Sequence, residues 1–258
     1  MWSYRGFIFG SVRREFQSKY QNSLLGAAWT VLNPLAMIVV YTVIFSQVMK
    51  AKLPGVESAL AYSIYLCCGV ITWGLFAEIV GRGQNVFIEN SNLLKKLSFP
   101  RICLPVITVL NALVDFAIVT LLFLVFLVIS GNLPGLVILF ALPVLVIQLL
   151  LAIGLGMILG VLNVFFRDVG QFFRIFVQFW FWFTPVVYPA SVLPKELSEH
   201  IMIWNPMAPI IGAYQSIFVS QVPPDWSKLA IPLFFSITLC AIGLRLFRRR
   251  SGEIVDEL

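Results

Sequence analysis

Long apolar runs separated by short polar stretches make up most of this chain. Six runs approach or exceed the roughly 20 apolar residues that a helix needs to cross a bilayer. They cover residues 24–48, 59–80, 102–129, 136–166, 172–188 and 229–247. Backbone groups inside a bilayer must pair within their own segment, so continuous apolar runs form helices there. The pattern therefore predicts an all-α integral membrane protein with six transmembrane helices.

A seventh apolar run, residues 201–219, is weaker than the other six. Asn205, Pro206 and Pro209 lie near its start. Proline interrupts a regular helix because it lacks an N–H donor and its ring clashes with the preceding turn. Irregular backbone at membrane depth is tolerated where protein buries it. We therefore expect a re-entrant helical hairpin within a long outer loop, residues 189–228, instead of a further crossing.

The distribution of Lys and Arg predicts the orientation. With six crossings, 14 of the 18 Lys and Arg residues fall on one side of the membrane, and the other side holds Lys50, Lys52, Lys195 and Lys228. The positive-inside rule then places both termini in the cytoplasm, together with the tail of residues 248–258. If residues 201–219 also crossed, the three arginines at 248–250 would lie outside.

The N-terminal segment, residues 1–22, has an amphipathic pattern. It is too charged for a cleavable signal peptide, and it lacks a continuous apolar centre. At 100° per residue, one narrow face collects the apolar side chains of Trp2, Phe9, Val12, Phe16 and Tyr20, and the charged side chains lie off this face. We expect a helix that lies in the cytoplasmic headgroup layer.

Composition excludes several classes of protein. Of the 258 residues, 60% are apolar and only 12% are charged, against about 45–50% and about 25% in soluble domains. A soluble enzyme and a disordered or nucleic-acid-binding chain are therefore excluded, and the net charge of +6 reflects topology. The four cysteines fall in or beside apolar runs, at spacings that suit neither a zinc site nor a disulfide framework. We expect them to be core residues.

Catalytic chemistry has little support in the sequence. The single histidine, His200, lies in a loop beside Glu196 and Glu199, and no cluster of acids and histidines appears elsewhere. The phosphate-binding pattern G-x-x-x-x-G-K-[ST] is absent. We therefore expect a transport protein that binds no metal or cofactor of its own and takes its energy from a partner.

Two acidic residues within the apolar runs bear on an ion-coupled carrier, which would need such groups. Glu78 stands four residues before Arg82, so an ion pair within one helix accounts for it. Asp115 lies about 20 Å into the third run. Two roles stay open for it: a structural hydrogen bond, or a place in the lining of a transport pathway.

The second cytoplasmic loop, residues 81–101, contains a short segment that is both apolar and basic. Its core is Asn92-Leu93-Leu94-Lys95-Lys96-Leu97, followed by Phe99 and by Pro100, which ends a helix and precedes the next span. Attraction to lipid headgroups would account for the two lysines alone. The leucines supply an apolar face that headgroups do not need, so we interpret the segment as a docking helix for a partner protein.

The fifth run carries the strongest indication of a substrate. Its polar side chains gather on one helical face with aromatic rings, which comprises Gln171, Arg174, Gln178, Phe181, Trp182 and Pro185. Amide and guanidinium donors beside flat rings suit sugars. On the first run a second row, Trp29, Asn33, Met37 and Tyr41, recurs at four-residue steps and would form the opposing wall of a channel. Helix packing combined with an interfacial aromatic belt is the alternative interpretation.

Five segments in order resemble the ABC-2-type permeases that export polysaccharides such as O-antigen, teichoic acid and capsule. They are residues 19–26 with Trp29 and Asn33-Pro34, residues 92–96 with Phe99-Pro100-Arg101 and Pro105, residues 166–169, residues 184–189, and Asn205-Pro206 with Ala208-Pro209. The resemblance covers nearly the whole chain as a single transmembrane domain, residues 1–258. At two positions, Gln21 and Gln215, many relatives carry a basic residue instead.

The resemblance implies a half-transporter in the bacterial inner membrane. Two copies would form a homodimeric channel for a polyprenyl-diphosphate-linked glycan, driven by two copies of an ABC ATPase subunit that uses ATP and Mg. The ATPase contacts would be Asn92, Leu93, Leu94, Lys95, Lys96, Leu97, Phe99, Arg167 and Asp168. An outer gate would include Pro185, Tyr188, Asn205, Pro206 and Pro209. An ABC-2 exporter of a drug or lipid, an ion-coupled carrier and a membrane enzyme remain as alternatives.

Overall fold

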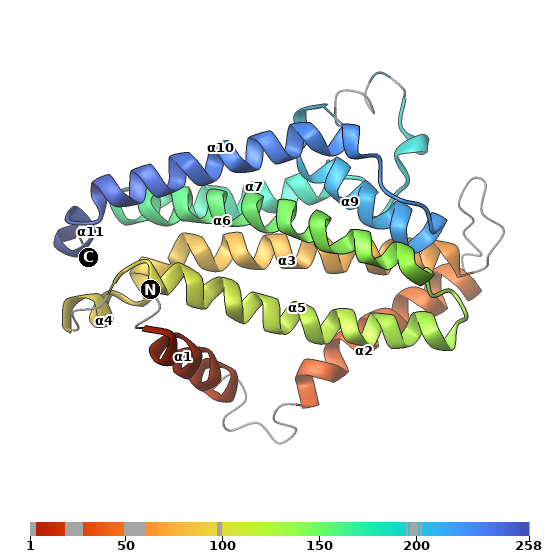
Figure 1. Cartoon of the computed structure of the whole chain (residues 1–258), viewed down its shortest axis with the longest axis horizontal. Helices are drawn as coiled ribbons and strands as arrows, with labels where there is room; N and C mark the ends of the chain where they lie inside the picture. The colour runs from red at the N-terminus through yellow and green to blue at the C-terminus, as the bar shows by residue number, and fades with distance from the viewer. Residues whose placement is uncertain are drawn as a thin grey trace.

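The computed structural model describes residues 4–18, 28–48, 60–96, 100–194, 196, 201 and 203–257, and these contain helices and no strand. Figure 1 shows an elongated bundle in which the longest helices run side by side. The elements are α1 (Arg5–Ser18), α2 (Trp29–Tyr41), η3 (Thr42–Val48), α3 (Ala61–Glu89), α4 (Ser91–Lys96), α5 (Cys103–Ile129), η4 (Gly135–Phe140), α6 (Ala141–Phe165), α7 (Asp168–Trp182), η5 (Ala190–Val192), α9 (Met207–Gln215), η6 (Ser216–Ser220), α10 (Trp226–Arg250) and α11 (Glu253–Glu257).

Four described helices are long and apolar enough to cross a membrane: α3, α5, α10, and α6 together with η4. The chain is therefore a multi-pass membrane protein, and these four agree with four of the six predicted spans. The other two spans are shorter in the structure. α2 continues into the π-helical turns of η3, and α7 has 15 residues, or about 22 Å of helix.

α7 ends six residues earlier than the fifth apolar run predicts. Its last residue is Trp182, and the chain then turns through Phe183 and Thr184. Pro185 explains the end, because its ring clashes with the preceding turn and disfavours a helical conformation at Thr184. Hydrophobicity alone did not show this boundary.

α6 packs against both α3 and α10 at backbone distance. A Cβ atom at Gly160 would lie 2.5 Å from the carbonyl oxygen of Gly83 on α3, and one at Gly154 would lie 2.6 Å from the backbone nitrogen of Cys240 on α10. Small residues allow this close approach between helices in membranes. α6 therefore lies between α3 and α10 and is in direct backbone contact with both.

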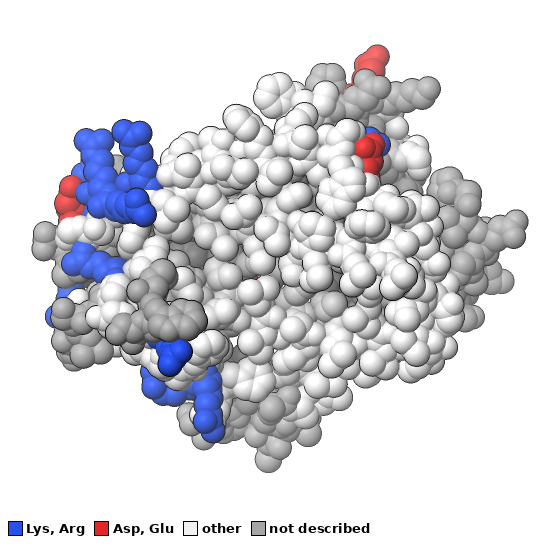
Figure 2. Space-filling model, viewed as in Figure 1, with Lys and Arg blue, Asp and Glu red and all other residues white. Residues whose placement is uncertain are grey.

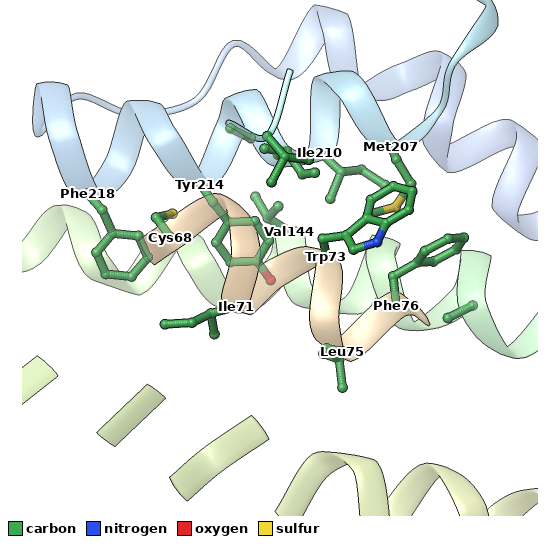
Figure 3. Close-up of a cluster of buried hydrophobic side chains, with 14 of the residues drawn as sticks. Cys68, Ile71, Trp73, Leu75, Phe76, Val144, Met207, Ile210, Tyr214 and Phe218 are labelled. Atoms are coloured by element: carbon green, nitrogen blue, oxygen red, sulfur yellow. The ribbon is translucent and has the colours of Figure 1, made fainter. Parts of the chain in front are cut away.

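α3 is the most enclosed of the long helices. In its most apolar stretch 72% of the residues are buried, against 17% to 28% in the other three. Figure 3 shows Trp73 and Phe76 on α3 packed close to Met207 and Ile210 on α9. α3 packs against α2, α5, α6, α7 and α9, so this helix forms the centre of the fold.

Basic side chains are concentrated at one end of the long axis of the bundle. Figure 2 shows most Lys and Arg at the end of the bundle where α1, α4 and the end of α10 lie. At the opposite end, Lys228 in the first turn of α10 pairs with Asp225 (3.4 Å), the residue just before that helix. This separation agrees with the charge pattern along the sequence, although Lys50, Lys52 and Lys195 lie outside the described residues.

Two predicted segments differ in detail. α3 continues to Glu89, so the first part of the loop predicted at residues 81–101 is helical. α1 has an apolar side chain on two of its sides: Ile8 is buried against Cys103 and Ile107 of α5, whereas Phe9 is exposed. The predicted face included Phe9 and missed Ile8, because the side of α1 that packs against α5 is apolar as well.

Candidate functional site

The predicted partner contacts lie at the basic end of the bundle. α4 has Asn92 and Lys95 exposed, Leu93 half-buried and Leu94 buried. Lys96 is the last residue of α4, its side chain is not among those described, and Leu97 and Phe99 lie outside the described residues. Arg167 and Asp168 are exposed where α6 meets α7. Both predicted contact segments thus have exposed residues at this end.

The inner face of α4 is held by an apolar cluster. Leu94 packs in it with Phe247 of α10 and Ile254 of α11. Arg250 stabilises the same corner, because its guanidinium pairs with Glu253 and lies 5.7 Å from the ring centre of Phe165. α4 is therefore fixed to the bundle on one side and exposed on the other.

Arg82 on α3 joins three helices. Its guanidinium lies 2.8 Å from Glu78 on the same helix, 2.6 Å from Glu15 on α1 and 3.6 Å from Asp115 on α5. Asn111 of α5 also donates a hydrogen bond to Glu15. The predicted pair between Glu78 and Arg82 is confirmed, and Asp115 has a cationic partner. Glu15 was missed, because nothing in the sequence links residues 67 positions apart.

α7 presents three different sides. Phe173, Val177 and Trp180 pack toward the core. A second side exposes Gln171, Arg174 and Gln178, with Trp182 60% exposed at its end. A third side exposes an aromatic row, Phe172, Phe176, Phe179 and Phe183. Phe181, predicted on the polar side, lies at its edge and packs edge-on against Trp73 (5.6 Å between ring centres). The polar side is thus open in the single chain.

α2 carries the second predicted row. Trp29 and Asn33 are exposed, whereas Met37 and Tyr41 are half-buried against the core. Asn33 and Met37 line a cavity of about 330 Å³ shared with Glu78 and Asp115. α2 packs against α3 and α5, and α7 packs against α3 and α6. Within one chain α3 therefore contacts both predicted walls.

The segment after α7 is held by hydrogen bonds against the N-terminal half of α3. The hydroxyl of Tyr65 donates to the backbone carbonyls of Pro185 (3.1 Å) and Tyr188 (2.9 Å). The amide of Gln215 also donates to the carbonyl of Pro185 (3.2 Å). These side chains satisfy carbonyls that no helix pairs. Gln215 is buried here, and a neutral amide makes this bond without the cost of burying a charge.

Asn205 connects this segment to α9. Its Nδ2 donates to the hydroxyl of Thr184 (2.8 Å), and its Oδ1 accepts from the indole of Trp180 (2.8 Å) and from the backbone N–H of Met207 (3.1 Å). Pro206 and Pro209 fall before and within the first turn of α9, where no N–H donor is needed. The structure thus brings Pro185, Tyr188, Asn205 and the start of α9, the residues of the predicted outer gate, into one region.

Asn163 on α6 is a buried polar residue that the sequence analysis did not single out. It contacts α3 and the first turn of α7. A polar residue inside an apolar run is itself a signal of a functional or packing role. Asn163 and Gln148 are the polar positions of the fourth run between residues 141 and 165, and that signal would have identified both.

Comparisons with known proteins agree over nearly the full chain. The sequence family described as ABC-2 type transporter matches residues 8–219. The O-antigen export system permease protein RfbA of Myxococcus xanthus is 32% identical over 260 residues, covering 100% of this chain and 97% of that protein. The protein of the same name from Klebsiella pneumoniae is 29% identical, covering 98% and 96%. The polysialic acid transport protein KpsM of Escherichia coli is 21% identical, covering 95% and 93%.

The match covers the greater part of α1 and continues from α2 into η6, and so includes both contact segments, the exposed side of α7 and the region around Asn205. Family and fold agree, since the four helices long and apolar enough to cross a membrane suit a membrane transporter. This chain therefore belongs to the ABC-2 type transporter family.

Proposed function

We propose that this chain is the permease subunit of an ATP-driven exporter that moves a lipid-linked polysaccharide of the O-antigen type across the bacterial inner membrane. The similarity to O-antigen export permeases over the whole chain carries the proposal. The exposed side of α7 supports it, because Gln171, Arg174 and Gln178 offer donors beside the ring of Trp182. Sugars combine hydroxyl groups with flat C–H faces and suit such a surface.

Two copies of the chain form the channel. Each copy crosses the membrane six times, with α2 and α7 as the two shorter crossings, and both termini lie in the cytoplasm. The basic end in Figure 2 supports this orientation. The exposed sides of α2 and α7 face the channel, so its walls come from both copies. The segment at residues 201–219 is re-entrant and closes the outer exit.

Two copies of an ATPase subunit drive the channel and bind the ATP and Mg. They dock on the exposed side of α4 through Asn92 and Lys95, and on Arg167 and Asp168. The burial of Leu94 supports α4 as a docking element, since a helix fixed to the bundle on one side moves the bundle when the ATPase subunit displaces it. The chain itself performs no catalysis and holds no cofactor.

Co-expression with an ABC ATPase subunit of O-antigen export tests the proposal. The host strain lacks its own O-antigen permease and carries the matching glycan pathway. We expect surface glycan only when both proteins are present, a complex that hydrolyses ATP, and no hydrolysis by the purified chain. ATP hydrolysis by the chain alone, or no surface glycan with both proteins inserted, would contradict the proposed function.

A further inference from the structure

α7 is joined to the rest of the chain by a buried asparagine at each end. Among the described residues, the side-chain hydrogen bonds from α7 to other elements lie at its first turn and near its last. Asn163 holds the first turn, and Asn205 holds the end. The polar and aromatic sides between these two points are exposed.

The inner attachment joins three helices through one amide. Asn163 is only 3% exposed. Its Oδ1 accepts from the backbone N–H of Gly170 (3.0 Å), and its Nδ2 donates to the carbonyl of Gln84 (2.9 Å) and to Oδ1 of Asn85 (3.2 Å) on α3. N–H groups in the first turn of a helix have no partner within it. Asn163 therefore caps α7 and ties it to α6 and α3.

The close contact between Gly170 and this amide requires a residue without a side chain at position 170. A Cβ atom there would lie 2.6 Å from Oδ1 of Asn163 and 2.9 Å from its Nδ2. Such distances are too short for non-bonded atoms, so any side chain at position 170 would displace the amide. The attachment can therefore be broken from either side, by a change in α6 or by a change in α7.

The outer attachment uses the same chemistry. The indole N–H of Trp180 donates to Oδ1 of Asn205, and Asn205 in turn caps α9 through Met207. The ring of Trp180 also packs edge-on against Trp73 (5.9 Å between centres) and Phe76 (5.2 Å) of α3. One residue thus makes a polar bond to the outer region and an apolar contact with the central helix.

We propose that α7 is a rigid link between the cytoplasmic contact at Arg167 and Asp168 and the outer region at Asn205, with Asn163 and Asn205 as its two attachment points. The inference rests on the proposed function. Arg167 directly precedes α7, so a displacement there moves the helix along its axis or tilts it. A helix hydrogen-bonded along its length does not stretch, so the end at Trp180 moves with the start. Asn163 and Asn205 are positioning residues in this scheme.

Labelling at the outer end tests the link in the complete complex of chain and ATPase subunit. Trp204, next to Asn205, is 81% exposed and is replaced by cysteine as a reporter. A membrane-impermeant maleimide is applied with and without ATP, alongside measurements of ATP hydrolysis, co-purified ATPase subunit and surface glycan. Cys67, Cys68 and Cys103 are buried and Cys240 half-buried, which limits background reaction.

Three variants break the attachments in different ways. Asn163→Leu removes the amide, Gly170→Ala displaces it, and Trp180→Phe removes the indole N–H but retains an aromatic ring. We expect each to reduce the ATP-dependent change in labelling and the glycan exported per ATP by about tenfold, with the ATPase subunit still bound. If Asn163→Leu fails to insert, Gly170→Ala tests the inner attachment.

Gln148→Leu is the matched control. Gln148 is a fully buried amide on α6 that donates to the carbonyl of Thr72 on α3 (2.8 Å), and this bond makes no contact with α7. We expect this variant to keep the labelling change. Retention of the change in all three test variants, or its equal loss in Gln148→Leu, would overturn the inference. Absence of any ATP-dependent change and of glycan export in the unaltered complex would instead count against the proposed function.

Discussion

Arg82 shows how much a single side chain can organise in this protein. It is half-buried, and it neutralises carboxylates from α1, α3 and α5. The sequence predicted the bond to Glu78, since four residues in a helix bring side chains together. It did not predict the bond to Glu15, because only the docking of α1 along α5 brings that residue near.

Replacing Arg82 with Gln should destabilise the permease by about 1–3 kcal/mol, between the values for exposed and buried ion pairs. Three carboxylates then lose their shared cation, and α1 loses its ion pair with α3. Thermal unfolding of the detergent-solubilised protein measures the loss. Lys228→Gln serves as the control: its side chain is 70% exposed and pairs only with Asp225 among the described residues. An equal effect of both variants would contradict a special role for Arg82.

Asp225 caps the start of α10, and we expect the stability that this cap adds to depend on pH. The hydroxyl and backbone N–H of Ser227 donate to its carboxylate (2.6 and 3.1 Å), which lowers the pKa of Asp225 below its ordinary value. A lowered pKa in the folded state adds stability above the ordinary pKa, and this contribution is lost as the pH falls through the lowered value.

The variant Asp225→Ala should therefore melt below the unaltered protein at neutral pH, and the gap should close as the solution is acidified past the ordinary pKa of the carboxyl group. Melting temperatures of both proteins over an acid pH series check this. A gap that widens on acidification would show that the charged carboxylate does not stabilise the cap.

At the scale of elements, hydrophobicity located the four longest helices. It did not show why α2 and α7 are shorter than the apolar runs that contain them. α7 ends at Trp182 because of Pro185, whereas apolar residues continue to Tyr188. The contact segment α4 was visible in the sequence, since its leucines and lysines separate on opposite sides and Pro100 follows. Its burial against α11 was not visible, because that contact joins residues 160 positions apart in a cluster that only the fold creates.

The arrangement of the candidate site residues could be predicted only in part, for a similar reason. Gln171, Arg174 and Gln178 form a row within a single helix, so the sequence of that helix is enough to predict it. The structure shows the three side chains together and exposed. Attachments such as those of Asn163 and Asn205 depend on pairs of helices. Helix periodicity gives the direction of a side chain within its own helix, and it says nothing about which helix comes to meet it.

The glycine contacts of α6 give a prediction at this scale. Gly160→Ala should cost about 1–3 kcal/mol, the usual range for overpacking, because its Cβ would meet the backbone oxygen of Gly83. Gly212→Ala on α9 is the control, since a Cβ there has nothing within 4 Å, and the change removes freedom from the unfolded chain. Thermal unfolding compares the two, and a neutral Gly160→Ala would show that α3 and α6 are not in backbone contact.

At the scale of the whole molecule, topology is the central prediction. Single cysteines at Lys228 and Gly252, both exposed, should react from opposite sides of the membrane. An impermeant maleimide added to intact cells, after the outer membrane is permeabilised, should label position 228. Position 252 should react only after the inner membrane is opened. If the N-terminus is cytoplasmic, labelling of both positions from outside would mean that the chain crosses the membrane an odd number of times before its tail. That result would contradict six crossings.

α3 enters the membrane well before the helices that enclose it. Most of its surface is covered by α5, α6 and α9, and α9 begins only at Met207. At a synthesis rate of about 5–20 residues per second, the delay is on the order of 10 s. During that time the polar groups of Ser63, Thr72 and Gln84 face lipid or the insertion machinery. A chain that stalls before α9 therefore leaves the least hydrophobic of the four long helices incompletely covered.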